Sequence, residues 1–107
     1  MNESEPTVTL KLEDTIRTVL MLEDAIGVMI SSIDMFTAQR DMNSKSGIYD
    51  SLEGKAALKR VEDGLEILKS KTMCRKFFLK DLKEVINETG IDIDSEVEKY
   101  KESFAGD

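Results

Sequence analysis

The chain has 107 residues, of which 40% are hydrophobic and 35% charged, and its formal net charge is −7. This size and balance fit one globular domain and exclude the disordered and fibrous classes. The single cysteine excludes a scaffold held by internal disulfides and favours a cytoplasmic location, and the acidic charge disfavours general binding to nucleic acid or anionic membranes.

The first residues, MNESEPT, are polar and acidic, unlike the start of a secretory signal peptide. We expect residues 1–7 to form a flexible acidic tail and residues 8–107 to form a single helical domain. One proline and six glycines leave few obligatory helix breaks in the chain. The expected fold class is therefore all-α.

A long helix is predicted from about residue 10 to residue 42, because apolar residues recur there at steps of three and four. The expected core stripe consists of Leu12, Ile16, Val19, Leu22, Ile26, Met29, Ile33 and Phe36. Glu23, Asp24 and Asp34 interrupt this apolar stretch, so it is not predicted to span a membrane.

A second apolar series on the same helix has a spacing of seven residues. It consists of Met21, Val28, Met35 and Met42. If the helix is the central element of a bundle, later helices of the chain cover this series. The alternative is a contact surface, either for self-association or for another protein, because methionine adapts to imperfectly matched partners and seven-residue spacing suits a helix-to-helix seam.

The loop 43–47 ends the first helix, and Asp50 or Ser51 is expected to begin the second. The core stripe of the second helix is Leu58, Val61, Leu65 and Leu68. The polar residues Lys71, Thr72 and Arg75 then interrupt it before Phe78, Leu82 and Val85 resume an apolar stripe. This interruption predicts a bend near residues 70–73 and a separate third helix.

Gly90 is expected to end the third helix in a left-handed conformation, and Asp94 or Ser95 to cap a short final helix. The expected architecture is thus a small helical bundle of three long helices and one short C-terminal helix. The first helix is expected at its centre.

No catalytic machinery is visible in the chain. It contains no histidine, which removes the commonest general base and metal ligand, and no glycine-rich phosphate loop. Cys74 precedes Arg75 and Lys76, but a buried structural cysteine is the preferred interpretation. The stretch DIDSE (92–96) lacks the glycine and glutamate that a calcium loop requires. We therefore expect a protein that is not an enzyme and has no metal or cofactor.

A basic cluster stands out in this acidic chain. Between residues 69 and 83, six basic residues face the single acid Asp81. Lys76, Lys80 and Lys83 share one helix face, and Phe77 lies beside them in the sequence. A solvated helix side would explain the cluster, and so would a docking face for an acidic partner.

The favoured function is a small regulator or adaptor, cytosolic or virus-encoded, that docks other proteins through the Met-rich face and the basic face. Homo-oligomerisation is compatible with this hypothesis, whereas nucleic acid and membrane are not the expected partners. The alternative is an oligomeric binder of a small anionic ligand such as a nucleotide. A carboxylate-based metalloenzyme ranks below both.

Overall fold

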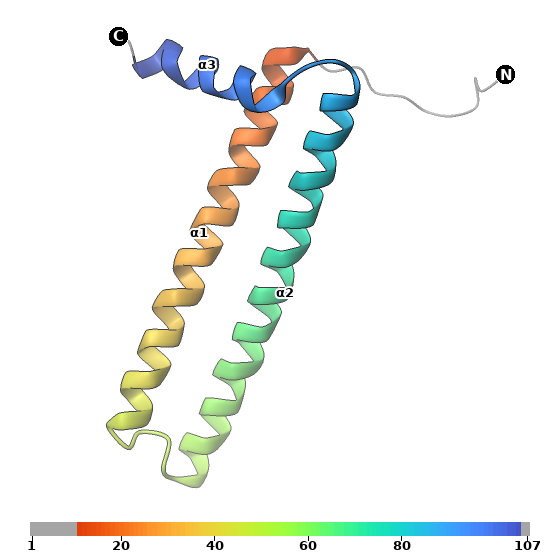
Figure 1. The fold of residues 1–107 in the computed structure, drawn as a ribbon. Helices are drawn as coiled ribbons and strands as arrows, with labels where there is room; N and C mark the ends of the chain where they lie inside the picture. The colour runs from red at the N-terminus through yellow and green to blue at the C-terminus, as the bar shows by residue number, and fades with distance from the viewer. Residues whose placement is uncertain (1–10, 106–107) are drawn as a thin grey trace, which may run out of the picture.

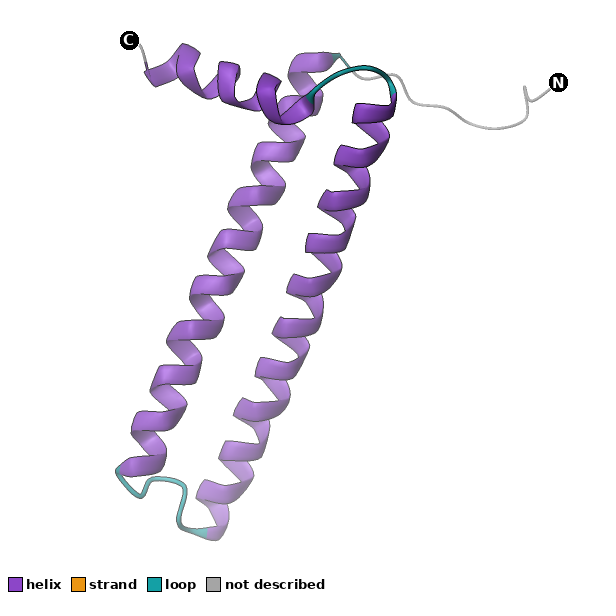
Figure 2. Ribbon diagram, in the orientation of Figure 1, coloured by secondary structure: helices purple, strands orange, loops and turns teal. Residues whose placement is uncertain are grey.

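The computed structural model describes residues 11–105 and contains there three helices, α1 (Leu12–Lys45), α2 (Leu52–Glu88) and α3 (Ile93–Ala105). The two long helices lie side by side and antiparallel, and α3 crosses the open end of this hairpin (Figure 1). The described residues form no strand (Figure 2). The all-α class is confirmed, whereas the predicted tail, residues 1–7, lies outside the described part of the chain.

The predicted bend near residues 70–73 is wrong, because α2 continues through it and replaces two of the three expected long helices. A constant step of seven residues from Leu58 leads to the buried positions Leu65, Thr72 and Ile86. Thr72 is polar, but its hydroxyl donates a hydrogen bond to the Leu68 carbonyl oxygen at 2.7 Å. A satisfied polar residue therefore occupies a core position without breaking the helix.

The uninterrupted helix also changes which apolar residues of its second half face α1. Leu79 and Leu82 pack against the core, whereas Phe78 and Val85 are exposed. The predicted stripe of Phe78, Leu82 and Val85 is thus wrong in two of its three members. The buried side of α2 passes through Leu65, Thr72 and Ile86 without a break. Because its middle position is polar, the sequence pattern wrongly suggested that a new helix with a different buried side begins there.

The predicted central position of the first helix is wrong as well. α1 contacts α2 along its length, and α3 contacts it only near the open end of the hairpin (Figure 1). Because α2 does not fold back on itself, no described helix covers the side of α1 that faces away from α2. Of the predicted core stripe, Ile16, Val19 and Ile26 are buried, while Leu12 and Phe36 are exposed.

The main hydrophobic core lies where the three helices meet. It consists of Ile16, Val19, Ile86, Ile93 and Val97. The side chains of Ile93 and Val19 are completely buried. Most of the hairpin between this core and the loop is a single pair of helices, in which each helix can bury only one stripe.

Helix ends follow the local sequence. Ser51 is the N-cap of α2, and its hydroxyl oxygen accepts a hydrogen bond from the Gly54 amide at 2.9 Å. The expected left-handed conformation of Gly90 is confirmed by its φ of 92°. The cap of α3 differs from the prediction: Asp92 rather than Asp94 or Ser95 lies before the helix, and its Oδ1 accepts from the Ser95 amide at 3.2 Å.

Gly54 is required where α2 meets the loop. A Cβ at this position would lie 2.4 Å from the Ile48 carbonyl oxygen, whereas a Cβ on Gly64 would meet no atom within 4 Å. Gly54→Ala is therefore expected to lower the free energy of unfolding by roughly 1–3 kcal/mol. The control Gly64→Ala should raise it by about 0.5–1 kcal/mol through helix propensity. Urea unfolding followed by circular dichroism measures both changes, and equal effects would contradict this account.

Candidate functional site

The seven-residue series on α1 lies on the exposed side of the hairpin. Met21, Val28, Met35 and Met42 expose between 58 and 72% of their surface. Ala25, Ser32 and Gln39 fall between them, so that positions alternate by steps of four and three along α1. We call these seven residues the outer seam. Together they form a second helix-to-helix stripe, on the side of α1 opposite to the one that packs on α2.

The surface beside the outer seam is shallow and carries two carboxylates, Glu23 and Asp24. A shallow groove there is formed by α1 alone, and its lining includes Gly27, Ser31 and Ser32 next to Val28 and Met35. Small side chains let another backbone approach closely, while Val28 and Met35 project from the helix. This relief suits a partner that also has alternating large and small residues.

The basic cluster borders a groove between α1 and α2. Two adjoining hollows of about 530 and 240 Å³ share Ile30 and Lys76. Lysines form the α2 side, and apolar residues form the floor. We call this continuous feature the lysine groove; it is lined by Ile26, Gly27, Ile30, Ile33, Lys69, Thr72, Met73, Lys76, Leu79, Lys80 and Lys83, with Glu23 and Asp34 on the α1 side.

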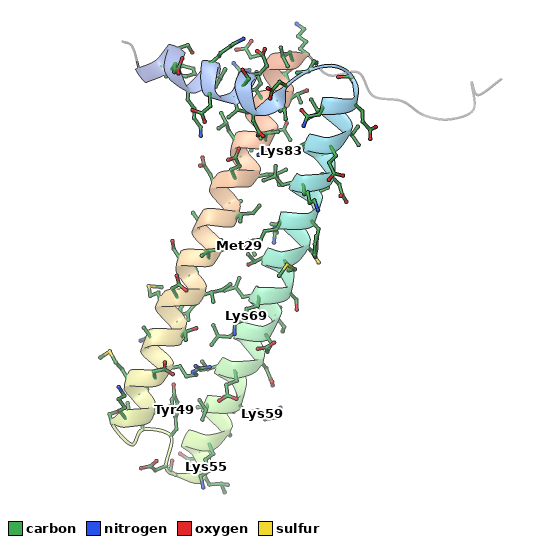
Figure 3. The ribbon with its side chains drawn as sticks, in the orientation of Figure 1. Met29, Tyr49, Lys55, Lys59, Lys69 and Lys83 are labelled. Atoms are coloured by element: carbon green, nitrogen blue, oxygen red, sulfur yellow. The ribbon has the colours of Figure 1, made fainter. Side chains whose placement is uncertain are left out.

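The four lysines of the groove do not have equal roles. Lys83 lies where the three helices meet (Figure 3), and its Nζ is 3.0 Å from Asp94 Oδ1 and 4.0 Å from Glu23 Oε1. Lys69 lies 3.8 Å from Glu66, on its own helix. Lys76 and Lys80 form no ion pair with a carboxylate of residues 11–105. They are therefore the two lysines of the groove that can pair with charge from outside.

Phe77 is 59% exposed but does not line the lysine groove. Of the four basic-face residues singled out in the sequence, the structure thus brings Lys76, Lys80 and Lys83 together and leaves Phe77 apart. Gly27 and Ile30, which lie across the groove on α1, were not predicted. Their place on the groove depends on how α2 packs against α1.

The surface of the hairpin on which α3 packs adjoins the lysine groove. Leu79 and Lys83 belong to both, since Leu79 packs against the core that holds Ile93 and Val97. A second polar contact holds α3 to α1, because Arg17 Nε donates to the Tyr100 hydroxyl at 3.1 Å. This hydrogen bond, followed by the charge of Glu13, raises the pKa of Arg17 above its ordinary value. An arginine guanidinium is charged at any ordinary pH, so the contact does not depend on this shift.

A further hollow of about 460 Å³ lies near the loop end of the hairpin. Its lining includes Phe36, Arg40, Tyr49 and Gly64. Gly64 and Lys69 are five residues apart on α2, about 140° around the helix. This hollow thus lies on a different side of the hairpin from the lysine groove, and sequence reasoning missed it because Tyr49 enters it from the loop.

No group of three or more histidine, cysteine or carboxylate side chains in residues 11–105 is arranged to hold a metal ion. Cys74 is exposed, not buried as the sequence suggested. No described helix is both long and apolar enough to cross a membrane. The two surface features that stand out in the described residues are the outer seam and the lysine groove.

Fold and surfaces together define a two-helix hairpin with a short third helix across its open end. Comparison with known proteins finds no matching family model, no similar curated sequence and no similar solved structure. The functional argument therefore depends on the residues of this chain alone.

Proposed function

We propose that this chain is a non-enzymatic protein–protein interaction protein, a small regulator or adaptor, that docks through the outer seam and the lysine groove. The observation that carries the proposal is the exposure of Met21, Val28, Met35 and Met42 on a helix side that no described element covers. A contiguous apolar stripe of this kind is costly to leave in water and is typical of an interaction surface.

The occupant proposed for the outer seam is a second copy of the chain. Along about 32 Å of α1, methionine and valine alternate with Ala25, Ser32 and Gln39 at the four-three spacing of a helix pair. In an antiparallel pair with Ala25 opposite Met42, Met35 of one copy faces Ser32 of the other. The outer seam of one copy therefore offers the small residues Ala25 and Ser32, on which methionines of the other copy can pack.

Charge favours one register of this antiparallel pair. When Ala25 lies opposite Met42 of the second copy, Asp24 of each copy lies beside Lys45 of the other. Neither Asp24 nor Lys45 forms an ion pair within residues 11–105. The two flanking pairs would fix orientation and register more than they add affinity.

The test of the proposal is the mass of the protein in solution. Light scattering coupled to size-exclusion chromatography should give twice the 12.1 kDa mass of one chain, with dissociation on dilution. A species of single-chain mass throughout the accessible concentration range would contradict self-association through the seam. The mass of a larger, closed oligomer would contradict the two-chain antiparallel arrangement in particular.

A further inference from the structure

The way α3 packs against the hairpin indicates what could bind in the lysine groove, because α3 is a helix that binds directly beside it. Residues 92–105, which contain α3, carry five carboxylates and two lysines, a net charge of −3. α3 buries Ile93 and Val97 against the hairpin, and its Asp94 pairs with Lys83 at 3.0 Å. α3 is therefore an acidic amphipathic helix that packs its apolar residues against the hairpin and pairs a carboxylate with a lysine.

The lysine groove continues the same combination of apolar residues and lysines beyond the surface that α3 covers. Its floor continues with Ile26, Ile30 and Ile33, and its α2 side continues with Lys80 and Lys76. From Glu23 to Asp34, the α1 side spans twelve residues, or about 16 Å, enough for three turns of a docked helix. Apolar floor and lysine rim are thus present, but no described element fills the space.

We propose that the lysine groove binds an acidic amphipathic helix of another protein. Apolar residues of that helix would lie on Ile30 and Ile33, and its carboxylates would pair with Lys76 and Lys80. This assignment rests on the proposed function as an interaction protein and names the partner class of one surface. An apolar floor favours a helix over a nucleic-acid backbone, since phosphates would leave Ile30 uncovered.

Gly27 offers a way to block the groove without disturbing the fold. It lines the groove, and a Cβ added there would meet no atom within 4 Å. Gly27→Leu should therefore place a side chain in the space that the partner helix needs. Gly64→Leu is the matched control: a Cβ there also meets nothing within 4 Å, and Gly64 lines the hollow on the other side of the hairpin.

The probe is a labelled synthetic peptide of about 14 residues with leucines on one helical face, glutamates on the flank that faces Lys76 and Lys80, and glutamines on the flank that faces Glu23 and Asp34. We expect saturable binding to the full chain in fluorescence anisotropy, weakened about tenfold by Gly27→Leu and unchanged by Gly64→Leu. Lys76→Glu/Lys80→Glu should weaken binding about tenfold, and so should replacing the peptide's glutamates by glutamines. Circular dichroism confirms that each variant is helical.

Three results would overturn the assignment. They are absence of saturable binding, equal binding by wild type and Gly27→Leu, and tighter binding of a labelled single-stranded oligothymidine through the same lysines. Val28→Glu/Met35→Glu separates this proposal from self-association, because it alters the outer seam and leaves the groove intact. Peptide binding by that variant would support the groove even if the wild-type chain is a monomer, and a fourth result, loss of binding, would assign the peptide to the outer seam instead and so overturn the proposal.

Discussion

Val28→Glu/Met35→Glu is expected to turn the proposed two-chain assembly into a monomer, with its dissociation constant raised about 100-fold or more. Both residues project from the middle of the outer seam, where Val28 is 66% and Met35 58% exposed in the single chain. In the antiparallel pair each glutamate would be buried in the interface without a cation to pair with, and burying such a charge is expensive. Sedimentation equilibrium over a dilution series measures the constant.

The control for added charge is Ile67→Glu/Val85→Glu on α2. Ile67 and Val85 are 58 and 59% exposed, so the apolar surface lost is comparable. The control should keep the wild-type mass, because neither residue belongs to the outer seam. If the control variant dissociates into monomers, or if Val28→Glu/Met35→Glu keeps the wild-type dissociation constant, the interface lies on another surface than the outer seam.

Ile93→Ala should cost about 2–5 kcal/mol of the free energy of unfolding, a large part of the 5–15 kcal/mol typical of a domain. The Ile93 side chain is completely buried where α3 meets the hairpin. Its loss leaves a cavity among residues of all three helices, at the only place in the described structure where three helices pack together. The destabilisation should therefore exceed that of any truncation along the two-helix part.

Urea unfolding in the Val28→Glu/Met35→Glu background measures this loss, because self-association would otherwise make stability depend on concentration. Ile67→Ala, at an exposed position of α2, serves as the control and should change stability by no more than about 0.5 kcal/mol. A similar loss in both variants would show that the core does not concentrate at the open end of the hairpin.

The first helix and the two ends of α2, at Ser51 and Gly90, could be predicted because they depend on local patterns. The periodicity around Ile16, Val19 and Ile26 and the left-handed glycine at Gly90 act within a few residues. The middle of α2 could not be predicted in the same way, since Thr72 is tolerated in the interior only because its hydroxyl binds its own helix backbone. That wrong break also produced the expectation of a bundle with α1 at its centre.

The residues of the candidate site on each single helix could be predicted, but the contacts between helices could not. Sequence spacing identified the series through Val28 and the lysines around Lys76, because each lies on one helix. What the sequence does not contain is the relation between helices: that nothing in residues 11–105 covers Val28, and that Lys83 is held by Asp94 and Glu23. The apolar floor between α1 and α2 follows only from their pairing.

Gly27 and Val28 lie about 100° apart on α1 and both border the shallow groove beside the outer seam, but Gly27 also lines the lysine groove, whereas no residue of the outer seam does so. One copy can therefore use both surfaces at the same time. A two-chain assembly then presents two grooves in a fixed, two-fold arrangement. A partner with two acidic helices on a linker of suitable length would bind such a pair with avidity, because the second helix docks at the high effective concentration that the first creates.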